Sequence, residues 1–305
     1  MILNRNELIE KISDLKDKKN AVILAHNYQN DEVQDVADFT GDSLELSQKS
    51  ASLDAEIILF CGVKFMAETA KILAPEKVVL LPVSSAGCPM ADMAQTQDIG
   101  HWQKQFRNPY TVTYVNSSAA VKALSDICVT SSNAVKIISD IPEDKEILFI
   151  PDSNLGAYAA EQANRKIHLW KGFCPTHIKV NPSLITEKKK LYPDAEVLLH
   201  PEIPADALKL ADKVLSTGGM VKYCRQSKTE RFLIGTEKGL LYRLRKENPG
   251  KEFIPLSEKL ICPMMKKTNL QDVYRSLVKM EYKINIEDDI IEDSLKPIKR
   301  MLEYV

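Results

Sequence analysis

Three cysteines could bind a metal centre together, and their spacing is the most informative feature of the chain. Cys88, Cys174 and Cys262 are each followed by proline and lie 86 and 88 residues apart. Thiolates are strong ligands for zinc and for iron–sulfur clusters. Six cysteines in 305 residues are too few for a disulfide scaffold, so we consider ligand, nucleophile and buried-thiol roles.

Three interpretations of these cysteines remain open at this point. Three thiolates with no evident fourth suit a [4Fe-4S] cluster in which one iron lacks a protein ligand and can act as a Lewis acid. Zinc bound by three thiolates and one histidine is the competing metal site. The cysteines could also be ordinary loop or core thiols. The remaining cysteines, Cys61, Cys128 and Cys224, do not keep the spacing and are interpreted as core or surface thiols.

The same period recurs upstream of each cysteine. His26, Tyr114 and His200 lie 62, 60 and 62 residues before the three cysteines, and an aspartate follows each of them by 12 residues. Five residues beyond these aspartates, which are Asp38, Asp126 and Asp212, stand the hydroxyl residues Ser43, Ser131 and Thr217. A period this long indicates a repeated supersecondary unit. We therefore predict three repeat units, at residues 1–90, 91–176 and 177–264, with segment 265–305 packing back on the first.

Short β-branched runs alternate with helical stretches inside each unit, which is typical of a parallel sheet. Helices are expected at 7–18, 97–106, 182–191 and 270–280. The fold predicted is α/β: three homologous three-layer α/β/α domains with short parallel sheets, arranged with pseudo-threefold symmetry around a central site. The expected strands are 21–25, 36–40, 57–61 and 78–82 in the first unit, 111–115, 127–130, 147–151 and 167–170 in the second, and 196–199, 213–216, 231–235 and 253–256 in the third.

The repeated polar residues follow these expected strands. In open parallel sheets, ligands bind beyond the carboxyl ends of the strands, where helix N-termini present free amides. If the three units meet about one axis with these edges inward, the polar groups converge with the cysteines on a single cavity. The residues in question are His26, Tyr28, Ser43, Tyr114, Asn116, Ser131, His200, Glu202, Ser216 and Thr217.

Simpler roles are available for several of these residues. Serine and threonine cap helix N-termini in most proteins, and a loop histidine or glutamate is ordinarily solvated. The three repeated aspartates precede their strands, which favours a structural turn over catalysis. His177, three residues after Cys174, could contact a metal group or only support it.

Composition excludes some classes of function. Lys and Arg (41) nearly balance Asp and Glu (42), so no basic surface for nucleic acid or anionic membrane is indicated. We see no signal peptide and no apolar run approaching a membrane span, and expect a cytoplasmic protein.

An ordered set of motifs resembles the quinolinate synthase family, the A protein of NAD biosynthesis. The motifs include AHNYQNDEVQDVADFTGDSLEL, GVKFMAETAKIL, CPMA, YVNSS, TSSNAV, PDSNLG, HPE, STGGM, GTEKG and the terminal CPMMK, and they run from about residue 20 to the C-terminus. The resemblance implies one [4Fe-4S] cluster held by Cys88, Cys174 and Cys262. It also implies a transferase that condenses iminoaspartate with dihydroxyacetone phosphate, forming quinolinate with loss of phosphate and water.

The resemblance further implies roles for individual residues. Tyr28, His200 and Glu202 would handle proton transfers, and we add His26 as a further acid or base. The substrates would be bound by His26, Ser43, Tyr114, Asn116, Ser131, His200, Glu202, Ser216 and Thr217. Functional coupling to an aspartate oxidase or dehydrogenase is expected, because the imine substrate is unstable. Two alternatives from other classes are a different cluster-dependent hydro-lyase and a non-catalytic metal-binding scaffold.

Overall fold

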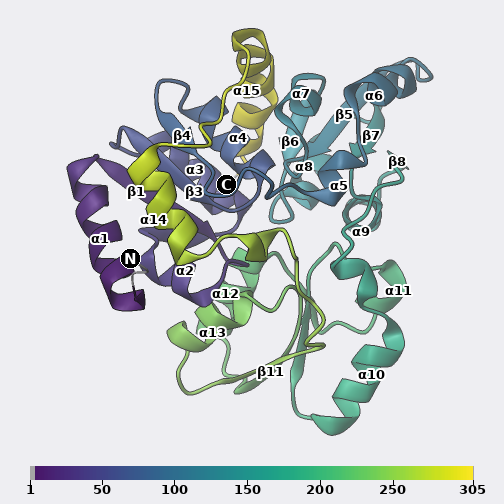
Figure 1. The fold of residues 1–305 in the computed structure, drawn as a ribbon. Helices are drawn as coiled ribbons and strands as arrows, with labels where there is room; N and C mark the ends of the chain where they lie inside the picture. The colour runs from purple at the N-terminus through teal and green to yellow at the C-terminus, as the bar shows by residue number, and fades with distance from the viewer. Residues whose placement is uncertain (1–3, 305) are drawn as a thin grey trace.

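The computed structural model describes residues 4–304 and contains three four-stranded parallel sheets (Figure 1). The strand order is the same in all three: the second strand of each sheet lies at one edge, followed by the first, third and fourth. This confirms the predicted α/β fold with three short parallel sheets. The sheets are β2 (Phe39–Gly41), β1 (Ala21–His26), β3 (Ile57–Cys61) and β4 (Val78–Leu80); β6 (Ile127–Val129), β5 (Pro109–Tyr114), β7 (Glu146–Ile150) and β8 (Ile167–Leu169); and β10 (Lys213–Val214), β9 (Glu196–Leu199), β11 (Arg231–Gly235) and β12 (Glu252–Pro255).

Every expected strand forms, with limits that differ from the prediction by at most three residues. The largest difference is at β2, which begins at Phe39 because Val36 is the last residue of a helix. The central strands are buried on both faces, as β3 is at all five positions, which explains their continuous apolar sequences.

Helices connect the strands and cover the faces of the sheets (Figure 1). The helices expected at 7–18, 97–106, 182–191 and 270–280 all form, with small shifts at their ends. In chain order the helices are α1 (Arg5–Lys18), α2 (Asp31–Val36), α3 (Ser43–Ser52), α4 (Lys64–Leu73), α5 (Pro89–Asp92), α6 (Thr96–Gln103), α7 (Ala119–Ala123), α8 (Ala134–Asp140), α9 (Ser153–Ala163), η1 (His177–Lys179), α10 (Pro182–Leu191), α11 (Ala205–Leu208), α12 (Thr217–Gln226), α13 (Leu240–Glu247), η2 (Met265–Lys267), α14 (Leu270–Lys279) and α15 (Asp288–Leu302).

The repeated aspartates make the same pair of hydrogen bonds in each sheet. The aspartate amide donates to a carbonyl oxygen of the first strand, and the carboxylate accepts from the amide of that same strand residue. Such bonds fix the loop that enters the second strand, which is a structural role. The pairs are Asp38 with Ile23, Asp126 with Thr111 and Asp212 with Val197, at 2.9 Å for the donated bond and 2.7–2.8 Å for the accepted one.

Apolar clusters join neighbouring sheets directly. One cluster contains Leu24 and Phe60 from the first sheet together with Leu198 and Phe232 from the third. A second combines residues around the second sheet with the C-terminal helix α15. Burying apolar surface across these junctions holds the sheets as one unit without flexible linkers.

The C-terminal segment contacts two of the sheets. Helix α14 packs beside α1 and against β3, next to the first sheet, and Figure 1 shows these two helices side by side. Helix α15 packs on α7 and β6 of the second sheet and also on α4. The segment therefore covers the second sheet as well as the first, and the unit boundaries themselves stay a prediction. Between residues 4 and 304, no helix combines the length and apolar character that a bilayer crossing requires.

Candidate active site

The carboxyl ends of the three sheets open on one shared cavity. His26 and Tyr114 are the last residues of β1 and β5, and His200 directly follows β9. Equivalent strand ends of three sheets therefore contribute to one site. Of the residues predicted from the sequence, all except Ser216 line this cavity: His26, Tyr28, Ser43, Cys88, Tyr114, Asn116, Ser131, Cys174, His200, Glu202, Thr217 and Cys262.

The three cysteines occupy equivalent positions in loops that follow the fourth strand of each sheet. Each precedes a proline and a short helical turn, and the backbone amides two and three residues further on lower the pKa of each thiol. Amides directed at sulfur stabilise the thiolate form, which is the form that binds metals. The amide donors belong to Met90 and Ala91, Thr176 and His177, and Met264 and Met265.

The thiols resist ionisation when no positive charge is near. Burial raises the pKa of Cys88 to about 12, and it also raises the pKa of Cys174 and Cys262. The sulfurs lie close enough to affect one another, since Cys262 raises the pKa of Cys88 and Cys88 raises that of Cys174. A bound cationic centre would offset both the burial of the thiolates and their mutual repulsion. Three thiols with convergent amides thus fit a thiolate-bound metal group.

A second candidate metal-binding group shares one of these cysteines. Ligand atoms of Cys174, His177 and Glu202 lie within 4.8 Å of one another. The His177 Nδ1 atom is 3.2 Å from the Cys174 sulfur and 2.7 Å from Glu202 Oε2. His177 is therefore the histidine that a site of three thiolates plus one nitrogen would use.

The two predicted cavity histidines are neutral hydrogen-bond donors. The Tyr28 amide donates to His26 Nδ1 at 3.2 Å, and the Glu202 amide donates to His200 Nδ1 at 3.4 Å. A ring nitrogen that accepts an amide proton carries none itself, so the proton of each neutral ring lies on Nε2. Burial lowers the pKa of His26 to about 4 and that of His200 to about 3. Both rings can donate to an anionic ligand near neutral pH without being charged.

A hydrogen-bonded chain runs from Tyr28 to Glu202. The Tyr28 hydroxyl lies 2.5 Å from Thr236 Oγ1, which lies 2.8 Å from His177 Nε2. Because the Glu202 carboxylate only accepts, His177 Nδ1 carries the proton between them. In the neutral ring Nε2 then accepts from Thr236, so Thr236 accepts from Tyr28. With one proton on the His177 ring, the chain is oriented to carry a proton away from Tyr28.

Glu202 is the ionised end of this chain. Burial alone would raise its pKa, but nearby His177 and hydrogen bonds from His177 and Tyr114 outweigh burial and lower it. The Tyr114 hydroxyl donates to Glu202 Oε1 at 2.7 Å. Burial raises the pKa of Tyr28 and Tyr114 well above 10, so both phenols keep their protons at neutral pH.

The predicted hydroxyl residues divide between two cavities. Ser43 and Thr217, the first residues of α3 and α12, line the main cavity with Ser131. Ser216 lines a neighbouring cavity instead. Its side chain caps α12 by accepting from the Gly219 amide at 3.0 Å, and it lies 2.8 Å from the Ser132 hydroxyl.

Asp42 is a cavity residue that the sequence analysis did not identify. Its Oδ2 atom accepts from Ser132, Ser216 and the Gly218 amide, at 3.1, 3.2 and 3.3 Å. These contacts join segments of all three sheets where the two cavities meet. A Cβ at Gly218 would lie 2.6 Å from Asp42 Oδ2, so this approach requires glycine. The available signal was its position directly before Ser43.

Thr236 and Glu237 were also missed. Both directly follow strand β11, and Glu237 lines the cavity. The Glu237 carboxylate accepts from the Gly239 amide at 2.7 Å and from the Cys262 amide at 3.2 Å, which fixes the third cysteine loop. Their position after a third strand was the signal, but the other two sheets have no equivalent threonine or glutamate.

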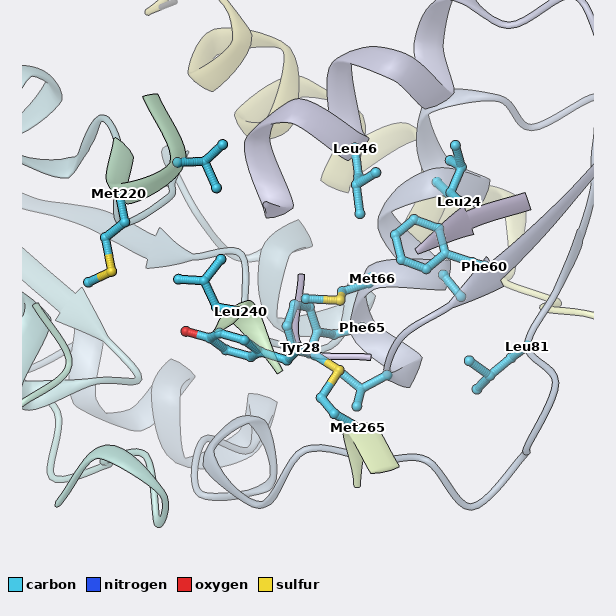
Figure 2. Close-up of a cluster of buried hydrophobic side chains, with 14 of the residues drawn as sticks. Leu24, Tyr28, Leu46, Phe60, Phe65, Met66, Leu81, Met220, Leu240 and Met265 are labelled. Atoms are coloured by element: carbon cyan, nitrogen blue, oxygen red, sulfur yellow. The ribbon is translucent and has the colours of Figure 1, made fainter. Parts of the chain in front are cut away.

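An apolar wall faces these polar groups. Figure 2 shows Tyr28 beside Phe65, Met66 and Met265, and all four line the cavity. Apolar walls lower the local dielectric and strengthen the polar interactions next to them. The site therefore suits a small anionic ligand that is shielded from bulk water.

Comparison with known proteins identifies close relatives of the chain. A family model described as quinolinate synthetase A protein matches residues 10–303. A protein named quinolinate synthase from Geobacter sp. (strain M21) is 50% identical over 300 residues, covering 98% of each chain. Another of that name, from Dehalococcoides mccartyi (strain CBDB1), is 48% identical over 301 residues, covering 99% of each. The matched region includes all three sheets.

Proposed function

The chain belongs to the quinolinate synthase family, and on that premise we propose that it condenses iminoaspartate with dihydroxyacetone phosphate to form quinolinate, phosphate and water. The comparisons confirm the family that the motifs indicated. The reaction proposed here goes one step further and names the two substrates. The observation that carries the proposal is the convergence of three equivalent Cys-Pro loops on a cavity that also contains neutral histidines and an ionised glutamate.

Cys88, Cys174 and Cys262 would hold a [4Fe-4S] cluster. The equivalent amide donors at each sulfur support three thiolate ligands of the same kind. When bound, such a cluster supplies an iron without a protein ligand, which polarises a substrate oxygen. Zinc held by the three sulfurs and His177 is the competing composition, and metal analysis distinguishes the two.

Several neutral donors would bind the anionic groups of the substrates. His26 and His200 donate Nε2 protons to the substrate from neutral rings, whose burial carries no charge-desolvation penalty. Ser43, Ser131 and Thr217 add hydroxyl groups. Charge-assisted hydrogen bonds of this kind are about twice as strong as neutral ones. Tyr114 and Asn116 complete the lining beside Glu202.

Tyr28 would transfer protons during the condensation and the dehydrations. Its oxygen can take a proton from the substrate while its own proton passes through Thr236 to His177 Nε2. The imidazolium that forms is stabilised by the Glu202 carboxylate at 2.7 Å. Reversal of the chain returns the proton to a departing hydroxyl, so one set of residues serves as base and then acid.

The direct test is quinolinate formation by anaerobically prepared enzyme, with iminoaspartate generated in the assay and dihydroxyacetone phosphate added. We expect product from the wild-type chain and from Cys61→Ala, a buried thiol outside the cavity lining. Glu202→Gln should lose activity by about 10²-fold or more, because the imidazolium loses its counter-charge. Consumption of a different hydroxyacid without use of dihydroxyacetone phosphate would indicate a hydro-lyase instead.

The chemistry of the imine also indicates the supplier. An imine of this kind hydrolyses readily in water, so we propose that an aspartate-oxidising enzyme in the same compartment, the cytoplasm, provides it. Simultaneous assay of both enzymes at limiting imine would measure this coupling.

A further inference from the structure

The hydroxyl group of Thr217 is held by a neighbour that lies outside the cavity lining. Asn27 Nδ2 donates to Thr217 Oγ1 at 2.9 Å, and Arg243 Nη1 donates to Asn27 Oδ1 at 2.8 Å. Asn27 is fully buried, and Thr217 is 3% exposed. Arginine has no acceptor, so the amide oxygen must face Arg243 and the amide nitrogen must face Thr217.

Arg243 is itself fixed in place. Its Nε atom donates to Glu247 Oε1 at 2.8 Å, and its Nη1 atom lies 3.7 Å from Glu45 Oε2. These two carboxylates leave the guanidinium little freedom to release the Asn27 amide. The orientation of that amide is therefore set by charged groups behind the site.

The orientation of the Asn27 amide determines where the Thr217 hydroxyl proton can point. With Oγ1 accepting from Asn27, the hydroxyl can still donate once, and none of the hydrogen bonds among residues 4–304 uses this proton. Thr217 lines the cavity and is the first residue of α12, where the helix N-terminus also favours negative charge. The free proton is available to an anionic ligand there.

We propose that Asn27, held by Arg243, is a positioning residue that sets Thr217 as a hydrogen-bond donor to a carboxylate or phosphate of the substrate. The inference rests on the proposed function for the identity of the ligand. Asn27 and Arg243 lie behind the cavity lining and influence specificity indirectly. Asn27 makes the Thr217 hydroxyl a donor, and a donor at this position favours anionic groups.

The sharpest test is Asn27→Asp, which keeps the size of the side chain and its contact with Arg243. An aspartate can only accept, so the Thr217 proton turns toward it and is lost to the ligand. We expect about a tenfold or greater increase in KM for an anionic substrate and in the Kd for quinolinate measured by titration calorimetry, with a smaller change in kcat. Thr217→Val should cause a similar increase.

A double-mutant cycle separates this role from simple repulsion or misfolding. In the Thr217→Val background, Asn27→Asp should add less than about twofold, because the proton it redirects is already gone. In the Thr217→Ser background, which keeps the hydroxyl, the full effect should return. Multiplicative effects in the Val background, or an unchanged KM and Kd in Asn27→Asp, would overturn the inference. If the wild-type enzyme forms no quinolinate and binds none, the proposed function fails instead.

Discussion

Thr236 offers a sharp test of the proton pathway, because its hydroxyl is the sole link between Tyr28 and His177 among the hydrogen bonds of the described chain. Thr236→Val preserves shape and volume and removes that one oxygen. Thr236 is fully buried, Tyr28 is 9% exposed and His177 is 2% exposed, so water cannot readily replace the lost partner.

The expected magnitude follows from these contacts. Two buried polar groups lose a partner, which should lower the free energy of unfolding by about 2–4 kcal/mol. Interrupting general acid–base transfer should lower kcat for quinolinate formation by about 10²- to 10⁴-fold. Thr236→Ser keeps the hydroxyl and should retain kcat within about tenfold.

The chain provides a matched control. Thr268 is also fully buried, and its hydroxyl has no hydrogen-bond partner within residues 4–304, so Thr268→Val should leave kcat unchanged and stability equal or slightly higher. All variants would be compared at equal metal content in a steady-state assay. Thr236→Val with a kcat within about threefold of wild type would refute the pathway, since no other link between Tyr28 and His177 is present in the part of the chain described.

Three further predictions concern stability. Burial lowers the pKa of His26 to about 4 and of His200 to about 3 from 6.5, so the unfolded chain binds more protons below pH 6.5. The stability that the neutral rings contribute is complete above pH 6.5 and is lost as the pH falls toward the folded-state pKa values. Urea titration of the metal-free protein should show the free energy of unfolding fall by about 2 kcal/mol per histidine between pH 7 and 5. This fall should be smaller in His26→Gln and in His200→Gln. An equal pH dependence in these variants would contradict the assignment of neutral rings. Asp38→Ala, Asp126→Ala and Asp212→Ala should each destabilise by about 1–2 kcal/mol in urea, because each removes the same carboxylate–amide bond, and widely different costs would argue against equivalent roles. Gly218→Ala should lower the free energy of unfolding by about 1–3 kcal/mol, since its Cβ would meet Asp42 Oδ2 at 2.6 Å, whereas Gly250→Ala, with open space around it, should have no such cost.

The fold could be predicted closely from the sequence because its signals are local. The expected strands 57–61 and 231–235 match the observed strands residue for residue, and they are buried at every position except Arg231. The start of β2 was harder, because Val33 and Val36 form the buried face of a short helix directly before it. A run of three residues, such as β2, shows too little hydrophobic periodicity to distinguish a strand from a helix.

The site could be predicted wherever a residue recurs in all three units. The three cysteines lie in equivalent loops, and His26, Tyr114 and His200 lie at equivalent strand ends, so all six residues reach one cavity. Thr236 and Asp42 act through contacts across sheets, and their positions, directly after a strand and directly before Ser43, are weak signals because neither residue recurs in the other units. Ser216 and Thr217 are adjacent hydroxyl residues, and the start of α12 decides which one caps the helix and which faces the cavity.

The central claim is that three equivalent cysteines hold one metal cluster in this cavity. Anaerobic purification with iron and sulfide analysis would test it on wild type and on Cys88→Ala, Cys174→Ala and Cys262→Ala, with Cys128→Ala and Cys224→Ala as buried controls. We predict about four irons and four sulfides per chain, with broad absorbance near 400 nm, in wild type and both controls. The cluster should be lost in each of the three cavity variants. Zinc in place of iron, or a cluster that survives all three substitutions, would contradict the account.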